Sequence, residues 1–228
     1  MARRTTVARA AASTAAGAIV CRPVTPARWP DLVRLFGPRG ACAGCWCMWS
    51  RLSAAEFERG KGERNRRALK RLVDAGGPVG LLAYMDGEPA GWCAVAPREQ
   101  YARLARSRVL APVDERPAWS VPCFFVGRAH RGRGVGRALL AAAVAFARGR
   151  GAARVEGYPL DPRGKRIADV WAWFGLASTF EAAGFREVAR RSPTRPIMRR
   201  ELRPARRTAS ASAVAGPRRT PLPRARHG

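Results

Sequence analysis

Three glycines in five residues, Gly132, Gly134 and Gly136, stand among arginines in the middle of this chain. An apolar, aromatic-rich run at 121–126 precedes them, and apolar residues recur at helical spacing over 139–147, so we expect a strand, a loop and a helix. Glycine lets a phosphate lie against the backbone, and a helix N-terminus directs free N–H groups at an anion. The segment therefore predicts a site for a phosphorylated ligand; a tight turn without a ligand is the alternative.

The spacing of this loop differs from two familiar phosphate-binding patterns. Arg131-x-x-Gly134-x-Gly136 is not followed by the Gly-Lys-Ser/Thr of a Walker loop. The dinucleotide fingerprint needs a third glycine three residues after the second, and that position is Leu139. The pattern instead resembles the pyrophosphate loop of the GNAT acyltransferases, Gln/Arg-x-x-Gly-x-Gly/Ala, which in that family follows the fourth strand and opens the third helix.

The elements that must position the loop agree with this resemblance. Strands and helices alternate in a way that predicts an α/β (α+β) protein, with a central mixed, twisted sheet and helices on its faces. The strands are expected at 18–25, 79–85, 90–96, 121–126, 153–160, 185–191 and 195–202, and the helices at 26–36, 53–75, 137–148 and 177–184. The sequence at 180–185, Phe-Glu-Ala-Ala-Gly-Phe, resembles the short GNAT helix that ends in Gly-Phe. The resemblance implies the GNAT fold, with about seven strands and about four helices.

Local signals support several of these boundaries. Ser53 with Glu56 three residues later forms a capping-box pattern for a helix start. Asp86 followed by Gly87 is typical of a tight hairpin between two strands. The Arg/Pro/Glu-rich segment 97–118 is expected to be an insertion over one end of the sheet, with a short helix near 99–107.

Length and composition predict one domain between two basic tails. We expect a disordered basic arm at 1–17, a GNAT acyltransferase domain at 18–202 and a disordered Arg/Pro-rich tail at 203–228. No stretch of 18 apolar residues occurs, which predicts that no segment spans a membrane. The six cysteines are expected to be reduced, as in a cytoplasmic protein.

The net charge of +27 comes almost entirely from arginine. Nucleic-acid binding is one interpretation of such a charge. The other is an Ala/Arg/Gly/Pro-rich composition that disperses charge over the surface, and it is favoured because the arginines are spread along the chain. Under either interpretation, a positively charged surface attracts an anionic ligand such as coenzyme A.

The GNAT resemblance implies an acyl-CoA ligand, expected to be acetyl-CoA acting as the acyl-donor co-substrate. It implies that backbone amides of the loop hold the pyrophosphate, that a stretch of strand pairs with the pantetheine arm, and that nearby arginines reach the nucleotide phosphates. For each arginine, a solvated surface role is the alternative. The implied cofactor-binding residues are Phe124, Phe125, Val126, Arg128, Arg131, Gly132, Arg133, Gly134, Val135, Gly136 and Arg137.

The implied chemistry is direct attack of an amine on the thioester, which needs a base for the amine and an acid for the leaving thiolate. Many family members have a tyrosine four residues before the Gly-Phe glycine; here that residue is Phe180, which donates no proton. Tyr158, Ser178 and Thr179 are candidates to replace the acid. Glu156, two residues before Tyr158 and on the same face of a strand, is a candidate base. Structural packing of Tyr158 and Glu156 is the alternative.

A cluster of cysteines and aromatic residues lies between the first two helices. Cys42-x-x-Cys45-x-Cys47 resembles part of a metal site, but no second Cys-x-x-Cys pair supplies further ligands, so no metal is expected. The cluster is expected to line the acceptor pocket, with a plug of the hydrophobic core as the alternative. Its candidate substrate-binding residues are Trp46, Met48 and Trp49.

The predicted function is therefore an N-acetyltransferase that acts on an amine of a small molecule or peptide. The protein is expected to be a monomer or homodimer with no membrane partner. Two other functions stay open at this point. One is a basic nucleic-acid-binding protein whose Gly-Arg loop contacts phosphate. The other is a CoA-binding protein of GNAT fold without catalysis, suggested by Phe180.

Overall fold

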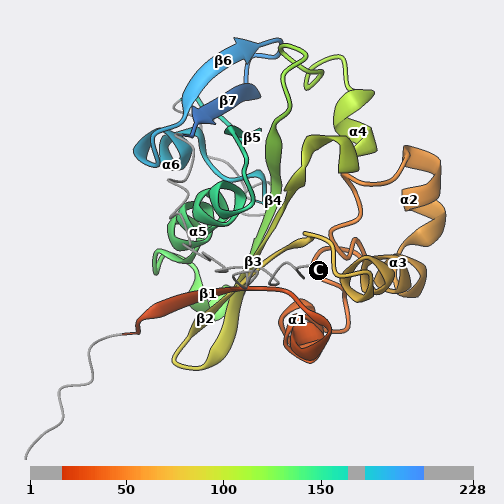
Figure 1. The fold of residues 1–228 in the computed structure, drawn as a ribbon. Helices are drawn as coiled ribbons and strands as arrows, with labels where there is room; N and C mark the ends of the chain where they lie inside the picture. Colours follow the sequence, from red (N-terminus) through yellow and green to blue (C-terminus); the bar gives the residue numbers. More distant parts are fainter. Residues whose placement is uncertain (1–16, 164–172, 203–228) are drawn as a thin grey trace, which may run out of the picture.

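The computed structural model describes residues 17–163 and 173–202, so the predicted tail and nearly all of the predicted arm lie outside the described residues. The described chain forms one seven-stranded sheet in the order β1-β2-β3-β4-β5-β7-β6 (Figure 1). Only β4 and β5 pair in parallel, so the expected mixed sheet is confirmed. The strands are β1 (Ile19–Pro23), β2 (Gly80–Met85), β3 (Glu88–Pro97), β4 (Trp119–Val126), β5 (Arg154–Gly157), β6 (Arg186–Arg190) and β7 (Pro196–Glu201).

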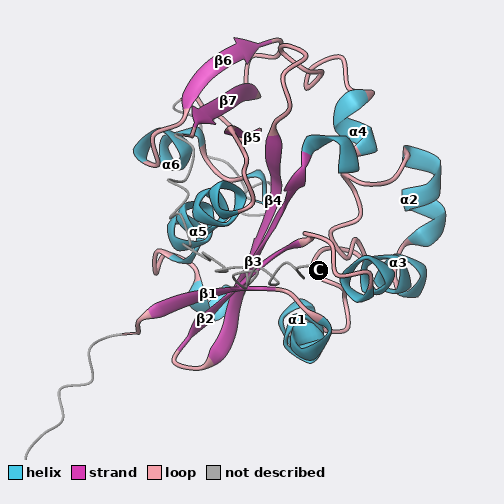
Figure 2. Ribbon diagram, in the orientation of Figure 1, coloured by secondary structure: helices cyan, strands magenta, loops and turns pink. Residues whose placement is uncertain are grey.

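Helices cover both faces of the sheet. Helix α5 lies against one face, and α1, α2 and α3 lie on the other (Figures 1 and 2). None of the helices in the described part of the chain is long and apolar enough to cross a membrane. The α-helices are α1 (Trp29–Phe36), α2 (Ala54–Gly60), α3 (Glu63–Asp74), α4 (Ala102–Ala105), α5 (Val135–Gly149) and α6 (Ala177–Ala182), and the 3₁₀ helices are η1 (Pro26–Arg28), η2 (Arg98–Gln100) and η3 (Arg128–His130).

The single helix expected after Ser53 is wrong, because the structure divides it into α2 and α3. Its start is confirmed: the Ser53 hydroxyl accepts from the Glu56 N–H at 3.3 Å, and the Glu56 carboxylate accepts from the Ser53 N–H at 3.0 Å. The division falls at Gly62, whose φ of 85° does not occur within a right-handed helix. Gly62 therefore separates the two helices, although the charged residues around it predict a continuous helix.

The β2–β3 hairpin turns as its sequence predicts. Asp86 and Gly87 have φ angles of 53° and 83°, the left-handed values that a two-residue turn of this kind requires. The turn sets the register next to it, and the register shifts once between Ala83 and Tyr84. Beyond that shift, alternate residues face opposite layers. Leu81 and Cys93 pack in the core beneath α5, whereas Leu82 and Trp92 pack against the α1–α3 layer.

Strand β4 contains a bulge at the point where its pairing with β5 ends. Ala94 pairs with Cys123 and Ala96 with Ser120, so two residues of β4, Val121 and Pro122, stand opposite one residue of β3. Proline has no N–H to donate, and a bulge is one of the few places where a sheet accepts it. On the other side, the pairing of β4 with β5 ends at Val121 and Gly157. The sheet therefore opens at its centre, and the far end of β4 continues beyond β5.

Candidate active site

The Gly-Arg loop opens α5 with space in front of it. Gly132 and Gly134 have φ angles of 73° and 83°, in the left-handed region that a residue with a side chain adopts at a cost. A Cβ placed on Gly132, Gly134 or Gly136 would meet nothing within 4 Å. Gly134 is the N-cap of α5, and the first N–H groups of a helix have no partner within it. The loop therefore presents backbone donors and a positive helix end to open space.

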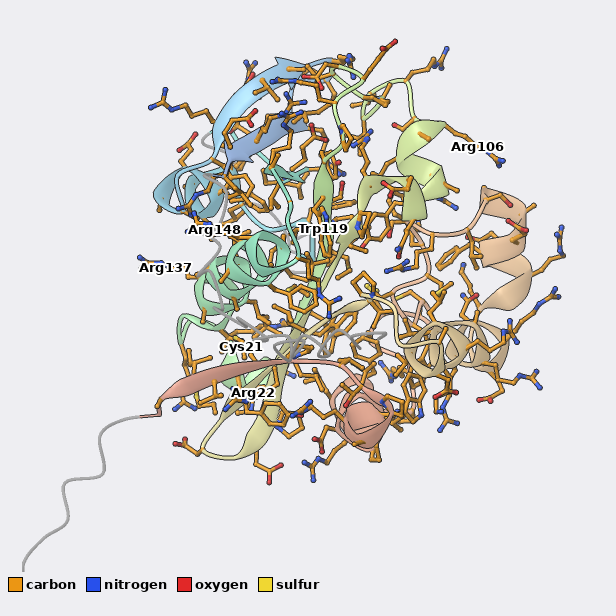
Figure 3. The ribbon with its side chains drawn as sticks, viewed as in Figure 1. Cys21, Arg22, Arg106, Trp119, Arg137 and Arg148 are labelled. Atoms are coloured by element: carbon orange, nitrogen blue, oxygen red, sulfur yellow. The ribbon has the colours of Figure 1, made fainter. Side chains whose placement is uncertain are left out.

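Four arginines surround this loop, and all are exposed. Arg131 donates from Nε to the carbonyl of Val126 at 3.4 Å, so its side chain folds back over the end of β4. Arg137, in the first turn of α5, points away from the fold in Figure 3. Arg128 and Arg133 are the other two. Together the four arginines place positive charge near the open space, which favours an anion there.

A cavity of about 210 Å³ lies beside the last residues of β4, shortly before the chain enters the loop. Two of the residues predicted to hold the pantetheine arm, Phe124 and Phe125, line it; Val126 does not. Its other walls come from α1, α2, the 41–50 loop, β3 and the residues before α6. The remaining lining residues are Phe36, Ala41, Cys42, Ala43, Cys45, Cys47, Trp49, Ser50, Phe57, Lys61, Trp92, Cys123 and Trp173. The walls are mostly apolar and aromatic.

The three predicted acceptor residues occupy different environments. Trp49 lines the cavity, where its ring meets Trp173 edge to face. Trp46 and Met48 are 5% and 3% exposed and belong to the core beneath α1, so packing describes them better than substrate contact. Sequence reasoning missed Phe57, whose helical face pattern was hidden by the charged residues around it.

Ser50 is a polar residue on the cavity wall that sequence reasoning also missed. Ser50 is 2% exposed, and its hydroxyl has no hydrogen-bond partner among the described residues. A buried hydroxyl without a partner costs free energy, so such groups are uncommon in folded proteins. Its position on a cavity wall is the arrangement expected of a group that a ligand satisfies.

Cys47 has an environment unlike the other cysteines of the cavity. Trp92 donates its indole N–H to the Cys47 sulfur at 3.1 Å. A hydrogen bond from the Cys123 thiol lowers the pKa of Cys47; burial opposes that shift, and the Trp92 N–H and the charge of Arg51 reinforce it. Burial instead raises the pKa of Cys45 to about 11. Cys47 is thus the cavity thiol whose surroundings favour the thiolate.

The predicted catalytic pair, Glu156 and Tyr158, lies together but away from the cavity wall. Both residues are 1% exposed. Glu156 pairs with Arg98 at 3.0 Å and with Arg199 at 2.7 Å, and it accepts the Tyr158 hydroxyl at 3.1 Å. Tyr158 also meets Ser120 at 2.8 Å and contacts Arg98. The carboxylate is therefore already neutralised by two guanidinium groups.

Burial and these contacts determine what the pair can do. Burial is the largest cause that raises the pKa of Tyr158 above its usual range, which makes the hydroxyl a poor acid. Neither residue lines the cavity. The arrangement is that of a buried structural network, and it favours the alternative to the catalytic roles expected from the sequence.

Phe180 is fully buried at the position where the resemblance implies an acidic tyrosine. Its ring packs edge to face on Phe124 and Phe185 and lies directly over Gly157. Phe180 is thus part of the main core and leaves the leaving-group acid unassigned. Within the described ranges, no group of three or more His, Cys, Asp or Glu residues is arranged to hold a metal ion.

Comparisons with known proteins bear on this site. A family model for the acetyltransferase (GNAT) family matches residues 46–159. No curated protein sequence matches the chain.

Solved structures with a similar fold include three acetyltransferases. The PaiA N-acetyltransferase of Thermoplasma acidophilum, in complex with coenzyme A, is 14% identical over 81% of this chain and 99% of its own, with a TM-score of 0.46. A GNAT family acetyltransferase of Brucella melitensis, in complex with acetyl-CoA, is 17% identical over 82% and 90%, with a TM-score of 0.43. The GNAT domain of S. lividans PAT is 22% identical over 82% and 97%, with a TM-score of 0.45.

Proposed function

The chain belongs to the GNAT acetyltransferase family, whose model covers half of its residues, and from this premise we propose that it is an acetyl-CoA-dependent N-acetyltransferase. The observation that carries the proposal is that β4 joins an anion-binding loop to an apolar cavity. Only a short stretch separates Phe125 on the cavity wall from the 3₁₀ helix that leads into the loop. A ligand with a charged end and an apolar, reactive end fits such a path.

Support for the donor comes from the loop and from the free side of β4. Phosphate oxygens fit the open space before Gly132, Gly134 and Gly136, where backbone N–H groups and the α5 dipole favour negative charge. The pantetheine arm carries amide groups, which pair with a strand edge as a further strand does. The edge at Phe124–126, beyond the last β4–β5 pair, supplies such backbone groups.

Support for the acceptor comes from the cavity. Its aromatic and aliphatic walls suit an amine with an apolar or aromatic body, and Ser50 offers one unsatisfied hydroxyl for a polar group. The acceptor is a small molecule or the side chain or terminus of a peptide. Direct attack of its nitrogen on the thioester is the simplest route, and that route calls for a base. Glu156 is poorly suited to that task because Arg98 and Arg199 hold it in the core.

The test of donor binding is a pair of glycine variants in one helix. Gly136 and Gly149 both belong to α5, neither has a left-handed φ, and a Cβ on either meets nothing within 4 Å. Gly136→Glu places a negative charge at the expected pyrophosphate, whereas Gly149→Glu places it at the far end of the helix. We expect Gly136→Glu to weaken acetyl-CoA binding by about a hundredfold or more, and Gly149→Glu to leave it close to wild type, by calorimetry.

The same variants separate the enzyme from the nucleic-acid alternative. Equal binding of acetyl-CoA by both variants would contradict the donor site. Salt-dependent binding of duplex DNA by a chain that gives no thermal shift with acetyl-CoA would favour the nucleic-acid interpretation. A screen of aromatic and aliphatic amines that detects free CoA thiol then distinguishes an active enzyme from a CoA-binding protein without catalysis.

A further inference from the structure

Four of the six cysteines, Cys42, Cys45, Cys47 and Cys123, line one cavity. They come from the loop after α1 and from β4, so the fold brings together thiols that are about 80 residues apart. Cys47 and Cys123 lie close enough to shift each other's pKa, downward for Cys47 and upward for Cys123. An indole nitrogen only donates, so the Cys47 sulfur is the acceptor in its contact with Trp92.

The Trp92 N–H, directed at the Cys47 sulfur, stabilises negative charge on it. The Cys123 thiol favours the thiolate most, the Trp92 N–H adds to it, and the guanidinium of Arg51 contributes at longer range. The residue is 5% exposed, so little water competes for the sulfur, yet it lines a cavity that a small molecule can fill. A sulfur that accepts a hydrogen bond, lies near a positive charge and lines a cavity has the surroundings that activate a cysteine nucleophile.

The neighbouring hydroxyl points independently to a ligand in this cavity. Ser50, three residues after Cys47, is buried and has no hydrogen-bond partner among the described residues. A ligand oxygen within the cavity would satisfy it. Phe124 and Phe125, the strand segment proposed for the pantetheine arm, line the same space. The acyl end of the donor and the Cys47 sulfur therefore share one cavity under the proposed function.

We propose that Cys47 is a catalytic nucleophile that carries the acetyl group from acetyl-CoA to the acceptor amine. This inference rests on the proposed function and replaces direct attack on acetyl-CoA with a covalent step. It accounts for a site whose expected base, Glu156, is paired in the core and whose expected acid is replaced by Phe180. A thiolate that attacks a thioester needs no base, and a departing thiolate is a stable leaving group.

The reaction balances in two steps. In the first, the Cys47 thiolate attacks the thioester carbonyl, a bond forms between its sulfur and the acetyl carbon, and the bond to the CoA sulfur breaks. CoA leaves as the thiolate and takes a proton from water. In the second, the acceptor amine attacks acetyl-Cys47, the amide forms, Cys47 leaves as the thiolate, and the amine proton passes to water. The Trp92 N–H stabilises the sulfur each time it becomes negative.

The first step can be tested without knowing the acceptor. A chain that forms acetyl-Cys47 reversibly transfers label from radioactive CoA into acetyl-CoA when no amine is present, and direct transfer does not. We expect this exchange in the full chain under a phosphine reductant, together with a peptide containing residue 47 that gains the mass of one acetyl group after acid quenching. Hydroxylamine should remove that group, because it cleaves thioesters.

Variants assign the exchange to one sulfur. Cys47→Ala should lower exchange more than about a hundredfold while acetyl-CoA still binds. Trp92→Phe keeps a ring in the core and removes the N–H together with part of the indole volume, so it should slow exchange about tenfold or more. Cys21→Ser, on β1 and outside the cavity wall, should exchange as wild type does.

Two outcomes would overturn the inference. One is a wild-type chain that binds acetyl-CoA but shows neither exchange nor acetylated Cys47. The other is a folded Cys47→Ala variant that exchanges within tenfold of wild type. If the wild-type chain fails to bind acetyl-CoA at all, the proposed function itself fails, and the binding measurement identifies that case separately.

Discussion

Glu156 illustrates how partners from distant parts of the chain decide what a residue does. Its spacing from Tyr158 predicts that the two side chains lie on one side, and they do meet, although Tyr158 lies just beyond the end of β5. The sequence does not reveal which other groups they contact. The partners, Arg98 and Arg199, lie 58 and 43 residues away. Two guanidinium groups pair with the carboxylate in the core, where a charge without partners is costly.

Removing this carboxylate should therefore destabilise the fold. Glu156→Gln leaves two arginine charges beside the core with one partner fewer, so we expect it to lower the free energy of unfolding by about 3–5 kcal/mol in urea titrations. Glu58→Gln removes an exposed partner of Lys61 and should change that free energy by no more than about 1 kcal/mol. A Glu156→Gln chain as stable as wild type but unable to transfer acetyl groups would instead make Glu156 catalytic.

Elements set by local sequence were the most predictable. The Asp86-Gly87 turn, the Ser53 capping box and the glycine loop before α5 each depend on a few adjacent residues, and each occurs where the sequence predicts it. The cavity was less predictable because its walls come from segments that are separate in the sequence. Cys123 lies on β4 and Trp173 in the segment before α6, both far in sequence from the 41–50 loop that they meet there.

Helix α6 depends on a glycine in β5. A Cβ on Gly157 would overlap the Phe180 ring, so the helix packs this closely only because residue 157 has no side chain. We expect Gly157→Ala to lower the free energy of unfolding by about 1–3 kcal/mol, because the ring must move within a filled core. Gly149→Ala, where a Cβ meets nothing, is the matched control and should not destabilise.

A second variant tests the cause of this effect. Adding Phe180→Leu to Gly157→Ala shortens the side chain that the new methyl group meets, so part of the lost stability should return. Purely additive losses in the double variant would show that the two residues do not compete for space.

At the scale of the whole molecule, ion pairs connect the 97–118 insertion to strand β7. Asp114 accepts from Arg199 of β7 at 2.6 Å and also pairs with Arg116. Arg199, followed by Arg116, holds the pKa of Asp114 well below its usual range. Its folded-state pKa is below its unfolded value, so the stability it contributes is present above the unfolded pKa and is lost as the pH falls through the folded pKa.

The pH dependence of unfolding should reveal this link. We expect Asp114→Asn to unfold at a lower temperature than wild type at pH 6. The gap should shrink as the pH falls below about 4, where the carboxyl group begins to be protonated in the unfolded chain. Differential scanning calorimetry across this range measures both curves. A gap that stays constant to low pH would mean that the lost contact is not electrostatic.

Strands β4 and β5 are paired at three positions, so the pairing in the middle of the sheet is short. On one side lie β1 to β4 and on the other β5, β7 and β6, so the sheet consists of two halves with a short common border. Acetyl-CoA bound where the β4–β5 pairing ends would contact both halves of the sheet. At a free concentration of a hundred times its dissociation constant, it would stabilise the folded chain by about 2.7 kcal/mol. The amount of folded protein in a cell would then follow the supply of its own substrate.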